Sequence, residues 1–247
     1  SKDGKSMYVV TGEWSKEFKN IEDKNSEPMY YENLPFRFDT KGIIYNKRAN
    51  VYKVNIRTKK FIKIIDGDAK DIISIESLVE GDKGLMLSFE QYNSKGTMLE
   101  EKIGLIENSK IKEIYSNGSM GNLFYYKDGL HAVGMKKRFD WPTNTTILKI
   151  SNTGKVSFKY SSFDRNIVKA EVNEAILYFL YEDSGKTLLR DGTNNIDLIN
   201  SEVTIKDFAF NNEQTFVIAN SFSNPDEVYE LNNGQLTKIS KANEFFT

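Results

Sequence analysis

Cysteine is absent from the 247 residues of this sequence, histidine occurs once and proline four times. The absence of cysteine excludes disulfide bonds, thiolate catalysis and cysteine-ligated metals. It is typical of a reducing compartment, so we expect a cytoplasmic protein. Because His131 is the only histidine, a transition-metal site would need carboxylates alone, which suits zinc poorly. We therefore predict no metal site and no cofactor.

An excess of one charge and a long apolar run are also missing. The 34 Lys and Arg residues balance 35 Asp and Glu residues, for a net charge of -1. This balance offers no overall electrostatic attraction to nucleic acid or to an anionic membrane. No apolar run is long enough to span a bilayer, and no charged-then-apolar leader follows Ser1. We predict no nucleic-acid partner, no membrane partner and no export signal.

Aromatic residues, by contrast, are abundant, with 16 Phe and 13 Tyr, and this composition favours strands. Short apolar-alternating segments come in pairs that are split by polar turn residues, and such a pair predicts a β-hairpin. The last pair is joined by Asn232-Asn233-Gly234, because Asn and Gly tolerate the positive φ of tight turns. The pair recurs five times: 50–54 with 61–64, 102–106 with 111–114, 146–150 with 156–160, 187–190 with 196–199, and 228–231 with 235–239.

A nearly continuous apolar segment precedes each hairpin, and such segments are typical of strands buried on both faces. These segments are 7–10, 85–87, 131–134, 176–179 and 215–219. Another short strand lies ahead of four of them, at 73–75, 123–126, 168–172 and 205–210. The unit thus has about four strands and a period of roughly 40–50 residues, which is typical of a propeller blade.

This period predicts an all-β fold, a β-propeller of which about five four-stranded blades are visible. A lone blade leaves both faces exposed to water, so blades must stack against one another to bury them. A β-sandwich is the alternative, because its strands are also evenly spaced, but it lacks the four-strand self-similarity. The pattern therefore favours the propeller.

Three segments resemble one family of known proteins. Asp3-Gly4-Lys5 resembles the turn that opens an inner strand in propellers of the prolyl oligopeptidase family. Segment 29–42, with its Pro35-Phe36-Arg37, resembles the acylaminoacyl-peptidase branch of that family. So does the hairpin that begins Pro225-Asp226-Glu227-Val228-Tyr229 and continues to Asn243-Glu244. In that branch this hairpin leads into an α/β-hydrolase domain.

The resemblance implies that 1–247 is the propeller domain of a larger serine peptidase, with WD40-like repeats and commonly about seven blades. We expect a fragment that begins inside a blade and stops where the hydrolase domain would start, so that this domain is absent from the chain. An insertion at about 13–47 interrupts the blade period. The implied partners are the α/β-hydrolase domain of the same parent protein and short peptide substrates.

Catalytic residues are not predicted in this chain. A serine hydrolase of the resembled family needs Gly-X-Ser-X-Gly, followed by an Asp and a His. The nearest match, 117–121, has Asn where the first Gly is needed, and we interpret it as a turn between blades. His131 lies in an apolar segment, where a packed structural histidine is more common than a base. Segment 66–71 lacks the spaced ligands of a calcium loop, so we predict a turn there.

Arg37 and Asp39 are the predicted substrate-binding residues. Loops of propellers present ligand-binding groups, and Arg37 suits a peptide carboxylate as Asp39 suits an amine. The alternative is that the two residues stabilise their own loop. The basic cluster 136–142 is better explained as a solvated blade edge, since edge lysines discourage strand-to-strand aggregation.

The function predicted from the resemblance is that of a non-catalytic domain that gates the access of short peptides to a hydrolase active site outside this chain. The parent protein is then a serine peptidase, although the chain alone has no catalytic triad. The alternative is a free-standing propeller that serves as a protein-binding scaffold. A five-bladed glycosidase is a third possibility, but no pair of carboxylates stands out for it. An incomplete set of blades exposes apolar faces, so we also expect self-association.

Overall fold

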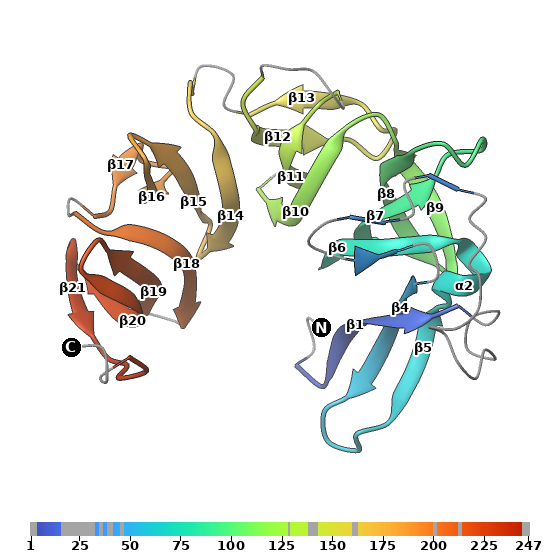
Figure 1. Cartoon of the computed structure of the whole chain (residues 1–247), viewed down its shortest axis with the longest axis horizontal. Coiled ribbons are helices and arrows are strands. Elements are labelled where there is room, and N and C mark those ends of the chain that lie inside the picture. Colours follow the sequence, from blue (N-terminus) through green and yellow to red (C-terminus); the bar gives the residue numbers. More distant parts are fainter. Residues whose placement is uncertain are drawn as a thin grey trace. The chain divides into compact units, whose positions relative to one another are not determined.

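The computed structural model describes residues 4–15, 33–34, 37–38, 42–44, 47–127, 129–137, 143–159, 163–199, 202–211 and 214–243. Within these residues the strands form five sheets and a two-stranded ribbon, and one helical turn is present (Figure 1). The predicted all-β class is confirmed. The chain divides into two compact units: Ser1–Leu123 with Lys136–Phe139 and Ser151–Lys155, and Phe124–Met135 with Asp140–Ile150 and Val156–Thr247.

The first unit holds a three-stranded sheet, a four-stranded sheet and the ribbon. The three-stranded sheet consists, in order, of β1 (Ser6–Trp14), β4 (Lys47–Asn55) and β5 (Phe61–Ile65). β1 pairs with β4 from Ser6 opposite Asn55 to Trp14 opposite Lys47. The ribbon consists of β2 (Arg37–Phe38) and β3 (Gly42–Ile43). The four-stranded sheet consists, in order, of β6 (Ile72–Gly81), β7 (Gly84–Tyr92), β8 (Leu99–Glu107) and β9 (Lys110–Tyr115).

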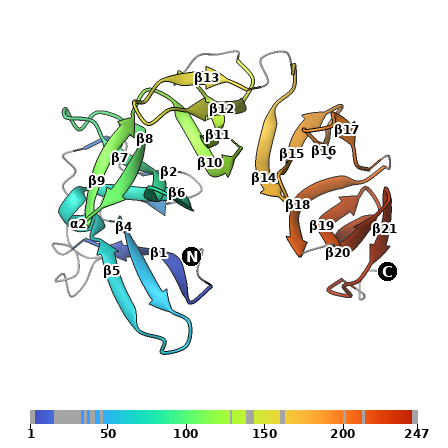
Figure 2. The same ribbon diagram turned by 180° about the vertical axis from the view of Figure 1, so that it is seen from behind.

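The second unit contains two complete four-stranded sheets and most of a third. The third sheet consists of β10 (Ser119–Tyr126), β11 (Gly129–Met135), β12 (Thr146–Ile150) and β13 (Val156–Phe158). The next consists of β14 (Ile167–Asn173), β15 (Ile176–Asp183), β16 (Lys186–Asp191) and β17 (Ile196–Asp197). The last consists of β18 (Thr204–Asn211), β19 (Gln214–Ser221), β20 (Asn224–Asn232) and β21 (Gln235–Lys238), a meander that Figure 2 shows from behind. The predicted repeat of four strands is confirmed for these sheets.

Tight turns with positive φ join several of these strands. Asn233 has a φ of 48° and Gly234 a φ of 80°, as the sequence predicted for the last hairpin. The same pair of positive angles occurs at Asn108-Ser109, Glu174-Ala175 and Ser184-Gly185. Two successive positive φ values give a turn whose twist matches that of the flanking strands. The turn therefore fixes the register of each hairpin, even where Glu174-Ala175 gives no sequence signal for it.

Strands buried on both faces join neighbouring sheets into continuous cores. Along β15, Leu177, Phe179 and Tyr181 pack in a cluster with β11, β12 and β14 residues, whereas Leu180 packs with β18 and β19 residues. Successive residues of a strand point to opposite faces, so each face of β15 covers a different neighbour. Phe179 and Leu180 are no more than 1% exposed. Burial on both faces, which the apolar segment 176–179 predicted, is confirmed.

The helical turn α2 (Gly67–Lys70) corrects a prediction, because the sequence predicted only a turn at 66–71. Asp71 ends it in the left-handed region, and its backbone N–H donates to Gly67 O. α2 lies against β4: the Gly67 backbone N–H donates to Asn50 Oδ1 at 2.9 Å, and Arg48 Nη2 lies 2.7 Å from Asp71 Oδ1. The charged residues Asp66 and Asp68 indicate only a turn, and they give no sign of the contacts with a distant strand that hold this segment.

An irregularity in register occurs at the same place in the first strand of three sheets. It lies between Ile72 and Ser74 in β6, between Ile167 and Lys169 in β14, and between Ile205 and Asp207 in β18. A bulge of this kind changes the direction of the side chains that follow it. Lys169 and Asp207 therefore occupy equivalent positions in adjacent sheets of the second unit.

Candidate functional site

Arg37 and Asp39, the residues predicted to bind substrate, are only partly covered by the structure. Arg37 lies in β2 opposite Ile43 of β3, and its side chain is exposed. Asp39 lies outside the described residues, as does most of the predicted insertion at about 13–47. The pairing of these two side chains with the ends of a peptide therefore stays a prediction.

His131 lies in β11 and is fully buried. Its ring stacks on Phe124 at 5.6 Å between centroids and meets the edge of Tyr126 at 6.0 Å. Its Nδ1 lies 3.0 Å from Gly129 O, and because a carbonyl only accepts, this contact places a proton on Nδ1. The ring thus serves packing within β10 and β11, the role that its apolar neighbours predicted.

The described residues offer neither a metal-binding cluster nor a membrane-spanning helix. The part of the chain that the structure describes holds no group of three or more His, Asp or Glu side chains arranged to bind a metal ion. Its helical content is likewise too short and polar to provide a membrane-crossing helix.

A buried carboxylate organises the end of the last sheet. Glu227 lies in β20 opposite Ala219 of β19 and is 2% exposed. It accepts hydrogen bonds from Ser240 Oγ, from Ala242 N at 3.2 Å and from Asn243 N at 2.9 Å. Lys238 Nζ lies 3.2 Å from its Oε1. We call Glu227 with Lys238, Ser240, Ala242 and Asn243 the carboxylate clamp.

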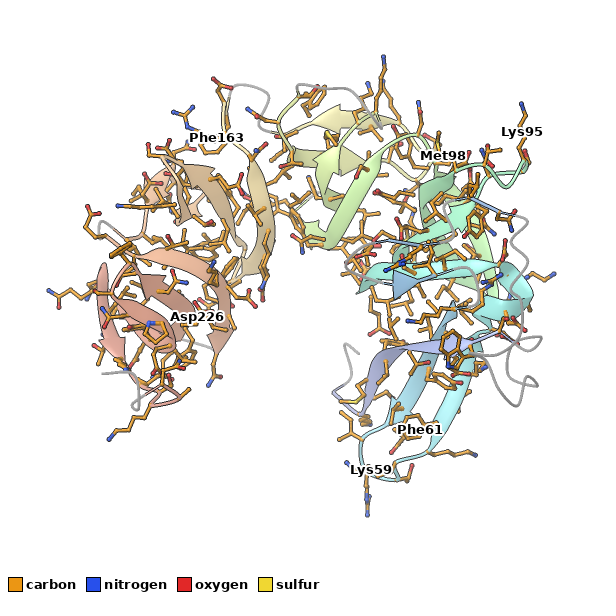
Figure 3. The ribbon with its side chains drawn as sticks, in the orientation of Figure 1. Lys59, Phe61, Lys95, Met98, Phe163 and Asp226 are labelled. Atoms are coloured by element: carbon orange, nitrogen blue, oxygen red, sulfur yellow. The ribbon has the colours of Figure 1, made fainter. Side chains whose placement is uncertain are left out.

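Further contacts tie the same segment to the sheet. Ser240 Oγ accepts from the Val228 backbone N–H at 2.8 Å, so this hydroxyl both donates and accepts. Asn243 Nδ2 donates to Asp226 O at 2.7 Å, and Asn220 Nδ2 donates to Asp226 Oδ1 at 2.6 Å. Figure 3 labels Asp226 in this region. Residues 240–243 follow β21 without strand pairing of their own, and the Glu227 side chain and backbone groups of β20 hold them instead.

The hydrogen bonds also set the charge state of the clamp. The hydrogen bond from Ser240 is the largest of the effects that lower the pKa of Glu227 to about 2. Desolvation opposes this shift, whereas the backbone N–H groups of Asn243 and Ala242 and the Lys238 side chain reinforce it. A carboxylate that accepts several N–H and O–H bonds is favoured in its ionised form. Glu227 is therefore an anion at neutral pH although its side chain is buried.

We expect stability to depend on this ionisation at acid pH. The pKa of Glu227 falls from 4.5 to about 2 on folding, so its stabilising contribution is complete above pH 4.5 and is lost as the pH drops toward 2. The free energy of unfolding, measured by urea titration at several pH values, should decrease across this window. Glu227→Gln should show a smaller decrease over the same window. An identical decrease in the variant would contradict the assignment.

A second polar contact joins the first strands of two sheets in the second unit. Lys169 Nζ of β14 lies 2.5 Å from Asp207 Oδ1 of β18 and donates to Phe208 O at 3.1 Å. The same ammonium lies 4.8 Å from the centre of the Phe208 ring and 3.7 Å from Glu171 Oε2. Since Lys169 and Asp207 are partly exposed, we expect the pair to position the two strands more than to stabilise the fold.

Sequence reasoning missed both polar contacts. The segment 225–244 was noted for its resemblance, but no chemical role was predicted for Glu227. A glutamate two residues after Pro225, followed by Ser240 and Asn243, is the signal that could have suggested it. Alignment of the repeats would have placed Lys169 and Asp207 at equivalent positions with opposite charges, which predicts a contact between successive sheets.

A polar hollow of about 370 Å³ lies at the turn between β15 and β16, lined by Arg165, Glu182, Asp183, Ser184, Gly185, Lys186 and Thr187. Its two cations are paired: Arg165 Nε lies 2.9 Å from Asp183 Oδ1, and Lys186 Nζ lies 2.5 Å from Glu202 Oε2. Arg165 accordingly lowers the pKa of Asp183. Glu182 Oε2 accepts from Asn166 Nδ2 at 3.2 Å. The clamp, where one buried carboxylate accepts three hydrogen bonds, is the better-built polar site.

Comparison with known proteins rests on structure. No protein-family model matches the sequence, and no curated protein matches it. An acylaminoacyl peptidase from Pyrococcus horikoshii superimposes with a TM-score of 0.74 at 12% identity, over 99% of this chain and 38% of that one. The chain has the fold of an acylaminoacyl-peptidase propeller. The predicted resemblance is therefore confirmed for the fold, and this chain spans about two fifths of the peptidase's length.

Two other solved structures match the propeller. An acylaminoacyl peptidase in complex with Z-Gly-Gly-Phe-chloromethyl ketone gives a TM-score of 0.72 at 13% identity, over 99% of this chain and 38% of that one. The β-propeller domain of the Trilobed protease from Pyrococcus furiosus gives a TM-score of 0.56 at 12% identity, over 98% of this chain and 83% of that one. The description of that protease domain notes an open velcro topology. At sequence identities this low, the superpositions establish the fold alone.

Proposed function

We propose that this chain is the propeller of a serine peptidase that resembles acylaminoacyl peptidase, and that it gates the access of short peptides to a hydrolase site carried elsewhere in the parent protein. The observation that carries the proposal is the superposition on propellers of peptidases over 99% of the chain. The segment 225–244, whose sequence resembles that branch, adds support.

The side chains of this chain suit a non-catalytic domain that limits access better than they suit an active site. Its only histidine, His131, is packed between aromatic rings of β10, and the sequence contains no Gly-X-Ser-X-Gly segment. A set of stacked sheets admits a substrate only through its openings, so it excludes by size and leaves small peptides unaffected. In this proposal Arg37 and Asp39 contact the ends of a bound peptide.

Activity of the parent protein tests the proposal. The polypeptide is expressed from its natural gene and assayed with N-acyl-peptide and aminoacyl chromogenic substrates, with and without a serine-directed inhibitor. We expect hydrolysis that the inhibitor abolishes. A well-folded parent protein that hydrolyses none of these substrates would overturn the proposal and favour the protein-binding scaffold.

Arg37→Ala and Asp39→Ala, made separately, should raise KM with little change in kcat if they bind substrate.

We further propose that the chain self-associates when it is studied alone. The sheet of β1, β4 and β5 exposes several apolar side chains, including Met7 at 48%, Phe61 at 60% and Ile62 at 54%. Figure 3 labels Phe61 and Lys59 on the hairpin of β4 and β5. Exposed apolar surface of this kind promotes association between copies.

Sizing chromatography over a range of concentrations tests this association. The wild-type chain should elute earlier as its concentration rises, and Phe61→Lys should reduce the shift. Ile196→Lys is the matched control, because Ile196 is 58% exposed on β17 in the other unit. A sharp monomer peak for the wild type at high concentration would contradict the proposal.

A further inference from the structure

The carboxylate clamp fixes a short segment that has no strand pairing of its own. Residues 240–243 follow the outermost strand of the last sheet, and among the described strands β21 pairs only with β20. Beyond Lys238, the backbone N–H groups of Ile239 and Ser240 still reach Val228 O, at 2.9 and 3.3 Å. The backbone N–H groups of Ala242 and Asn243 donate to Glu227 instead. One side chain thus holds residues 240–243 against β20 beyond the last strand pairing.

The geometry of the clamp is specific to a glutamate at this position. Glu227 Oε2 accepts from Ser240 Oγ and Ala242 N, and Oε1 faces Asn243 N and Lys238 Nζ. Both oxygens are used, so an amide in place of the carboxylate would turn an NH₂ group toward one set of donors. A buried carboxylate satisfied in this way holds its donors in one arrangement.

We infer that Glu227 is a positioning residue: it fixes the direction in which the polypeptide leaves the last sheet, and through it the placement of the hydrolase domain against the propeller. This inference rests on the proposed function. The placement of the two domains sets the size of the opening through which a peptide enters. A variant that weakens the clamp therefore changes which substrate lengths are accepted. This effect is distinct from a loss of folded protein.

Hydrogen exchange of the chain tests the structural half of the inference. Amide exchange at Ala242 and Asn243 should accelerate about tenfold or more in Glu227→Gln, because their acceptor loses its charge. Glu230→Gln is the matched control: Glu230 lies on the same strand, accepts from Gln214 Nε2 at 3.0 Å and should leave both amides unchanged. Unchanged exchange at Ala242 and Asn243 in Glu227→Gln would overturn the inference.

Kinetics of the parent protein test the functional half. The ratio of kcat/KM for a short N-acyl peptide to that for a long unstructured peptide should change by about threefold or more in Glu227→Gln. A purely structural effect would lower both values together and leave the ratio unchanged. Ser240→Ala keeps the charge of Glu227 but removes one of its donors and the acceptor of the Val228 N–H, and it provides a second variant if Glu227→Gln does not fold.

The outcomes separate the two proposals. A wild-type parent protein that hydrolyses neither peptide overturns the proposed function. Hydrolysis with an unchanged ratio in both Glu227→Gln and Ser240→Ala overturns the positioning role and leaves the proposed function standing. A changed ratio that accompanies faster exchange at Ala242 supports the inference.

Discussion

Gly67→Ala is expected to lower the free energy of unfolding by about 3 kcal/mol or more. A Cβ atom at Gly67 would lie 2.0 Å from Ala49 O and 2.7 Å from Ala49 C, both backbone atoms of β4. Ala49 is 4% exposed and part of the core between β4 and β6, so it has little freedom to move. The added methyl group would push α2 off β4 and weaken the bond from Gly67 N to Asn50.

Chemical denaturation followed by circular dichroism measures this loss. Gly12→Ala is the control, because Gly12 lies in β1 of the same sheet and a Cβ there meets no atom within 4 Å. It should be neutral or slightly stabilising, since alanine reduces the entropy of the unfolded chain. Equal stability of the two variants would show that α2 does not dock on β4 as described.

Gly154→Ala is expected to lower the free energy of unfolding by about 3 kcal/mol. Gly154 lies in the turn between β12 and β13, where Gly154 N donates to Ser151 O at 3.0 Å. Two costs combine at this position. Its φ is +78°, which an L side chain rarely adopts, and a Cβ would lie 2.2 Å from Ile114 O of β9.

Gly185→Ala separates these two costs. Gly185 has a φ of +77° in the turn between β15 and β16, but a Cβ there meets no atom within 4 Å. This variant should lose only the backbone term, about 1 kcal/mol. The difference between Gly154→Ala and Gly185→Ala, measured by urea denaturation, then reports the close approach of the turn to β9. No difference between them would contradict that approach.

Much of the fold followed from the sequence because each strand carries a local signal. The continuous apolar segment 176–179 indicated burial on both faces, and Asn233-Gly234 indicated a tight turn. Both signals depend on neighbouring residues alone, so they can be recognised without knowledge of the partner strands. The resemblance carried by 225–244 likewise led to the propeller fold that the superposition shows.

The rest depended on contacts between residues far apart in the sequence. α2 is held by β4 through Asn50 and Arg48, and the charged residues of 66–71 give no sign of those partners. Glu227 and Asn243 are 16 positions apart and meet only because β21 turns the chain back on β20. Lys169 and Asp207 meet across two sheets. Such contacts arise from tertiary packing, which local propensity does not encode.

Size selection by the parent protein tests the central claim most directly. The measurement compares kcat/KM for a short N-acyl peptide with kcat/KM for the same cleavage sequence displayed in a flexible loop of a stable folded carrier. A peptidase with an open active site, which cleaves both substrates, serves as the control. If the stacked sheets gate access, the parent protein hydrolyses the short peptide and leaves the carrier intact. Cleavage of both substrates with similar kcat/KM would contradict the account.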